Sequence, residues 1–177
     1  TAGEARFRNG SVFAVKGFTT TASGNYQMSF AFDDAEWRWG GNDYTITTSS
    51  VASADALYYR NRTIRMDGTG VILKPLANKT FTVAMPFEGT GGLVSAGEGT
   101  VAFKDDALQF TGLLDIRSGT VDLTASDALA TLTAKGPGTL KGGTITNLTL
   151  QETLASGSLS GVPILDGVTA GRVVIDL

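Results

Sequence analysis

The residues with the clearest chemical potential lie in the segment DDAEWRWGGND, residues 33–43. Trp37 and Trp39 are two positions apart, so on a β-strand both rings point to one face and Arg38 points to the other. An exposed pair of indole rings could stack against the apolar face of a sugar, whereas a buried pair would close one end of a core. Large aromatic side chains contribute mainly through burial, which favours the second interpretation.

The same segment carries three carboxylates, at Asp33, Asp34 and Glu36. Carboxylate oxygens bind calcium, and a pair of carboxyl groups can hydrolyse a glycoside. Neighbouring acidic residues in a loop are more often simply hydrated. Together with the two tryptophans and the arginine between them, these residues form the candidate ligand-binding set. We expect no catalytic residue, no metal site and no cofactor.

A second acidic pair, Asp105 and Asp106, invites comparison with the acidic clusters of β-helical polysaccharide lyases and hydrolases. Aspartate is also among the residues most favoured in tight turns, because its side chain bonds to nearby backbone and tolerates left-handed conformations. A turn is the interpretation that we prefer for this pair.

The composition excludes several kinds of chemistry. Histidine and cysteine are both absent, which excludes disulfides, Ser-His-Asp and Cys-His catalysis, and nearly all zinc sites. The net charge of −3 argues against nucleic acid, which proteins hold mainly by neutralising phosphates. The absence of a long apolar run predicts that this segment does not insert into a membrane. A first residue other than Met and a last strand RVVIDL indicate a piece of a longer chain.

These residues must be positioned by β-structure. The chain has 23 glycines and 18% charged residues, against an ordinary charged fraction of about 25%. Apolar residues alternate with polar ones in NYQMSFAF, KTFTVAM and GRVVIDL, each bounded by turn-forming residues. In TITNLTL the alternation breaks, which predicts a corner at Thr146 and Asn147. Only residues 49–61 have weak helical spacing, and a loop or a short turn suits them equally.

A repeat organises these strands. Gly99-Thr100, Gly119-Thr120 and Gly138-Thr139 begin 20 and 19 residues apart, and each pair is followed by Val or Leu. A period near 20 with short strands is typical of a solenoid, in which each coil buries one face in a shared interior and pairs with the coils on either side. Glycine permits the tight bends between strands.

The segment from Gly91 to Leu123 resembles the autotransporter-associated β-strand repeat, also called the passenger-associated transport repeat. That family has a Gly-Gly-Leu start, a Gly-x-Gly-Thr strand, a Thr-Gly turn and a closing Gly-Thr strand. Two positions depart from it: Ser95 replaces the usual Lys, and Leu108 the usual Asn. The matching residues are Gly91, Gly92, Leu93, Gly97, Gly99, Thr100, Val101, Thr111, Gly112, Gly119, Thr120 and Val121.

The resemblance implies an all-β fold, a right-handed parallel β-helix with a single-stranded solenoid path. Residues 1–177 would form one solenoid domain, in which 1–60 are irregular coils or a cap and 61–177 are repeat-like coils. It also implies a secreted or surface-displayed bacterial passenger, located outside the cell or at the outer-membrane surface. The repeat carries no catalytic residues, so the expected role is a rigid stalk or an adhesin whose partners are host or matrix glycans or glycoproteins.

Two other functions remain open at this point. β-Helices often act on sugars, so the chain could be a carbohydrate-active enzyme or a carbohydrate-binding module; this is an analogy at the level of fold. It predicts a groove lined by two or more carboxylates. The chain could also be a fragment of a phage fibre or spike, which would be trimeric.

Overall fold

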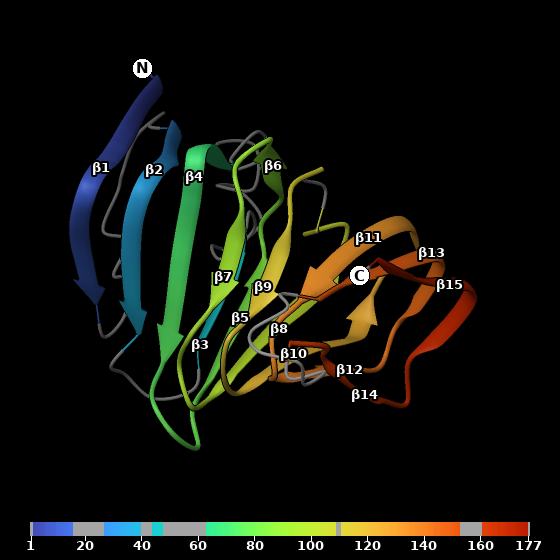
Figure 1. Ribbon diagram of the computed structural model, residues 1–177. Helices are drawn as coiled ribbons and strands as arrows, with labels where there is room; N and C mark the ends of the chain where they lie inside the picture. The colour runs from blue at the N-terminus through green and yellow to red at the C-terminus, as the bar shows by residue number, and fades with distance from the viewer. Residues whose placement is uncertain are drawn as a thin grey trace.

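The computed structural model describes residues 2–15, 27–39, 44–47, 63–108, 111–152 and 161–176. These residues form two parallel β-sheets, and they contain no helix (Figure 1). Sheet A consists of β1 (Ala2–Val15), β2 (Gln27–Trp39), β4 (Ile64–Pro75), β6 (Phe87–Gly89), β7 (Leu93–Ser95), β9 (Leu114–Ile116), β11 (Leu129–Lys135), β13 (Thr144–Gln151) and β15 (Thr169–Asp176). Sheet B consists of β3 (Tyr44–Thr47), β5 (Thr80–Ala84), β8 (Thr100–Asp105), β10 (Thr120–Ser126), β12 (Thr139–Lys141) and β14 (Ile164–Asp166).

From β2 onward the chain passes back and forth between the two sheets, with β6 and β7 both in sheet A. Each described strand pairs in parallel with the preceding strand of its sheet, except that β6 and β7 both pair with β4. The strands therefore follow one another in space in the order of the sequence, as the colours of Figure 1 show. This arrangement confirms the predicted parallel β-helix. The candidate helix at residues 49–61 lies outside the described residues. No helix of the described part of the chain is long and apolar enough to cross a membrane.

The Gly-Thr repeat forms one corner of the solenoid. Thr120 pairs with Thr100 on one side and with Thr139 on the other, so the three repeats stack in register as predicted. The glycine before each threonine lets the coils approach closely. Gly119 has φ +68°, and a Cβ there would overlap the carbonyl oxygens of Gly97 and Gly99.

A second column of bends runs through sheet A. The pairing of β1, β2 and β4 shifts between Arg8 and Ser11 and between Asp33 and Ala35. Asn9 and Asp34 have φ values of 55° and 54° at these shifts, and asparagine and aspartate tolerate this left-handed conformation better than other side chains. In β13 the bend falls where the sequence predicts it, because Thr146 and Asn147 are both exposed between buried neighbours.

The rows of inward side chains form one continuous core. In sheet A, Leu93 pairs with Val71 and Leu114, and each of these three is at most 1% exposed. Near the N-terminus the core is aromatic, whereas the later coils contribute mainly Leu, Ile and Val. Ser95, at the position where the family has Lys, is 1% exposed and faces this interior.

The coils are not uniform along the chain. Phe30 pairs with Ile64, so that coil takes 34 residues, whereas the later coil from Thr100 to Thr120 takes 20. The strands that lie within residues 1–60 are stacked in the same two sheets. At the other end, the last described strands carry partly exposed apolar side chains: Leu165, Val173 and Ile175 are 41%, 48% and 57% exposed.

The close stacking at the glycine corner predicts that a side chain at Gly119 destabilises the fold. We expect Gly119→Ala to lower the free energy of unfolding by about 3 kcal/mol or more, because strain at positive φ adds to a backbone overlap. Gly167 is the matched control, since it has φ +67° but open space around the site of a Cβ. Gly167→Ala should cost only the strain of about 1–2 kcal/mol. Equal losses in chemical denaturation would contradict the close stacking.

Candidate functional site

The structure places the Trp37 ring inside the solenoid. The residue is 1% exposed, and its ring centroid lies 5.2 Å from that of Phe32 and 5.0 Å from that of Phe81. The ring therefore belongs to the core, as the burial interpretation expects, and offers no exposed surface for a sugar. Trp39 ends β2, and its side chain lies outside what the structure describes.

The carboxylates of β2 are divided by the bend at Asp34. Asp34 is exposed at the bend itself. Before the bend, the Asp33 carboxylate lies against Gly68, in the space that a Cβ would fill. After the bend, Glu36 lies on the outer face of sheet A. No group of three or more acidic side chains among the described residues is arranged to hold a metal ion.

Glu36 is held by two cations. It accepts a hydrogen bond from Nε of Arg38, and Nζ of Lys74, on the neighbouring strand, lies 3.0 Å from its second oxygen. The hydrogen bond from Arg38 is the main reason that the pKa of Glu36 lies below its usual range; burial opposes this effect and Lys74 reinforces it. Within the predicted set, the structure thus brings Glu36 and Arg38 together.

A second cluster of the same kind was missed in the sequence. Asp115 is 8% exposed, and its Oδ2 lies 2.9 Å from Nε of Arg117 and 4.0 Å from Nζ of Lys135. Lys135 is the residue that pairs with Asp115 in the next rung. The available signal was the spacing, because an acid and an arginine two positions apart recur as EWR and DIR.

An ion pair joins two rungs on the outer face of sheet B. Oδ1 of Asp122 accepts a hydrogen bond from the backbone N–H of Thr124 at 2.9 Å, and Oδ2 accepts one from Nζ of Lys141 at 3.0 Å. Burial raises the pKa of Asp122, but these hydrogen bonds outweigh burial and leave the pKa lowered. Hydrogen bonding to Asp122 raises the pKa of Lys141.

The second acidic pair lies at the rim of a surface cleft between two coils. Asp105 has φ 53°, and the N–H of Ala107 donates to the carbonyl of Lys104 at 3.0 Å, as the turn interpretation expects. The backbone N–H of Asp127 stacks on this turn by donating to the carbonyl of Asp105 at 2.8 Å.

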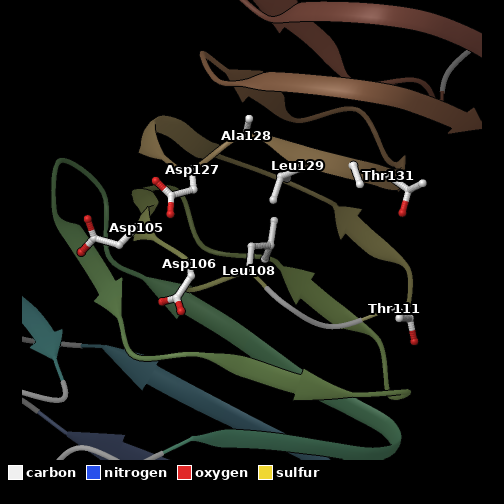
Figure 2. Close-up of a pocket in the computed structure, with 9 residues that line it drawn as sticks. Asp105, Asp106, Leu108, Thr111, Asp127, Ala128, Leu129 and Thr131 are labelled. Carbon is white, nitrogen blue, oxygen red and sulfur yellow. The ribbon is translucent and has the colours of Figure 1, made fainter.

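The cleft has a volume of about 410 Å³. Figure 2 shows the carboxylates of Asp105, Asp106 and Asp127 on one side, with Leu108 and Leu129 in the middle. The three aspartates are exposed. The described lining thus combines acidic and apolar side chains.

Comparison with protein-family models, with curated proteins and with solved structures found no match.

The lowered pKa of Glu36 predicts that the free energy of unfolding decreases as the pH falls into the acid range. Its contribution to stability is complete above the ordinary glutamate pKa of 4.5 and is lost as the pH falls through the lowered value. We expect Glu36→Gln to destabilise the chain at pH 7 by at most about 1 kcal/mol, as for other partly exposed ion pairs. The loss relative to the native chain should vanish in strong acid.

Denaturant titrations between pH 2 and pH 7 measure this difference. Glu88→Gln is the control, because Glu88 is also a glutamate of sheet A but is exposed. A difference between Glu36→Gln and the native chain that stays constant with pH would contradict the assignment.

Proposed function

We propose that this chain is a non-enzymatic, rigid segment of a secreted or surface-displayed bacterial passenger, which acts as a stalk or as an adhesin. The observation that carries the proposal is the in-register stack of Gly-Thr corners over a continuous core, in which each coil supports its neighbours. The resemblance of residues 91–123 to the passenger-associated repeat supports the same role.

The dimensions suit a spacer. Eight strands follow one another along sheet A, and at about 4.8 Å per rung they extend about 34 Å. Backbone pairing and packing between neighbouring coils make the energy of such a structure nearly a sum over coils. A spacer built in this way can lose or gain a whole coil without losing its architecture.

This property gives the test of the proposal. Deletion of residues 100–119 joins Gly99 to Thr120 and removes one full coil, whereas deletion of residues 100–109 removes half a coil. With the chain placed between a signal peptide and an outer-membrane barrel, we expect the full-coil variant to be displayed and to resist protease. The half-coil variant should be degraded. Its later strands would reach the wrong sheet, so they could not pair in register with the coils before them.

The same cells distinguish an adhesin from a plain spacer in a mucin-binding assay and on a glycan array. Binding that survives removal of the coil assigns adhesion to the remaining surface, and an absence of binding reduces the role to that of a spacer. Failure of the native chain to reach the cell surface in folded form would contradict the proposal. A trimer in analytical ultracentrifugation would favour a phage fibre.

A carbohydrate-active enzyme or binding module is the second candidate, and the acidic cleft is the observation that favours it. A groove lined by two or more carboxylates is what this alternative predicts, and Asp105, Asp106 and Asp127 meet that description. If the alternative holds, the native chain should cleave or bind acidic or neutral polysaccharides. Asp105→Asn with Asp106→Asn should then reduce turnover or binding at least about tenfold. If turnover or binding were unchanged in this variant, the cleft would be excluded as the site of that activity.

A further inference from the structure

One line of side chains on the outer face of sheet A, near the ends of β2, β4, β9 and β11, carries more positive than negative charge. Four cations, Arg38, Lys74, Arg117 and Lys135, lie beside the carboxylates of Glu36 and Asp115. We call these four residues the cationic strip. Each carboxylate lies between two cations, so each cluster keeps a surplus of one positive charge. This surplus occurs in a chain whose net charge is −3.

The cations extend outward and the carboxylates do not. The side chains of Arg38 and Arg117 are 55% and 56% exposed, whereas those of Glu36 and Asp115 are 14% and 11% exposed. A molecule that approaches this face therefore meets guanidinium and ammonium groups first. Ion pairing orders these groups without using all of their donors, since a guanidinium has five N–H bonds.

The stacking of the coils arranges the strip in a line. Arg38 pairs directly with Lys74 in the next rung, and Lys135 pairs with Asp115, two residues before Arg117. The four cations thus follow the solenoid axis from β2 to β11. Neighbouring rungs are about 4.8 Å apart, so a linear partner with evenly spaced negative groups can contact several rungs at once.

We infer that the cationic strip binds a linear acidic polysaccharide, with sugar carboxylates or sulfates on the guanidinium and ammonium groups. The inference deepens the proposed function, on which it rests for the choice of an extracellular polymer. A sugar polymer suits the strip better than nucleic acid because the surplus is only one positive charge per cluster. Proteins hold nucleic acid mainly by neutralising many phosphates.

The test measures binding of the purified full chain to fluorescent polygalacturonate at low ionic strength. We expect binding that weakens as salt is added. Replacement of both Arg38 and Arg117 by Gln should weaken it about tenfold, the combined loss expected for two exposed charge contacts. The matched control replaces Lys104 and Lys141 by Gln, which removes the same charge elsewhere and should leave the affinity within about twofold.

Several outcomes would overturn the inference. They are no binding by the native chain, equal weakening in both double variants, or binding of neutral dextran as strong as that of polygalacturonate. Tighter binding of a single-stranded oligonucleotide or of phosphatidylserine vesicles would assign the strip to another polyanion. Circular dichroism and thermal melting confirm that the variants are folded. Failure here leaves the coil-deletion test intact, so the stalk proposal stands or falls separately.

Discussion

The close approach of one backbone to the next at the corners of the solenoid is the constraint on which the other features depend. At Gly119 the carbonyl groups of the preceding coil occupy the space of a side chain, and at Gly70 the backbone of Gly92 does the same. These contacts fix the height and the register at which each coil returns to its starting point. The interior rows, and the outer rows that bring Glu36 beside Lys74, follow from that register.

The sequence predicted the architecture because its signals are local and repeat. The Gly-Thr spacing predicts which residues pair between neighbouring coils. The break in alternation within TITNLTL predicts the corner at Thr146 and Asn147. Coil length is less predictable outside the Gly-Thr repeat. The coil from Phe30 to Ile64 takes 34 residues, a length that the 20-residue spacing does not predict.

The direction of Trp37 shows what local pattern alone could not decide. Strict alternation from Phe30 and Phe32 places Trp37 on the opposite face. Asp34 adopts a left-handed conformation that inserts one extra residue, so that Ala35 and Trp37 point inward after the bend. The cluster around Asp115 was hidden for a related reason, because its contact with Lys135 depends on the length of the coil between them. Pairs two residues apart, such as Glu36 with Arg38, are easier to foresee.

The change in the core along the axis gives the solenoid a direction. Stacked rings of Phe7, Phe32 and Trp37 fill the first rungs, and β1 pairs with β2 over most of its length. The last rungs are packed with smaller aliphatic side chains, and those of β14 and β15 are partly exposed to solvent. If tension is applied along the chain, the aliphatic rungs separate before the aromatic ones, because their smaller side chains bury less apolar surface. A solenoid with this gradient yields stepwise under tension rather than rupturing at once.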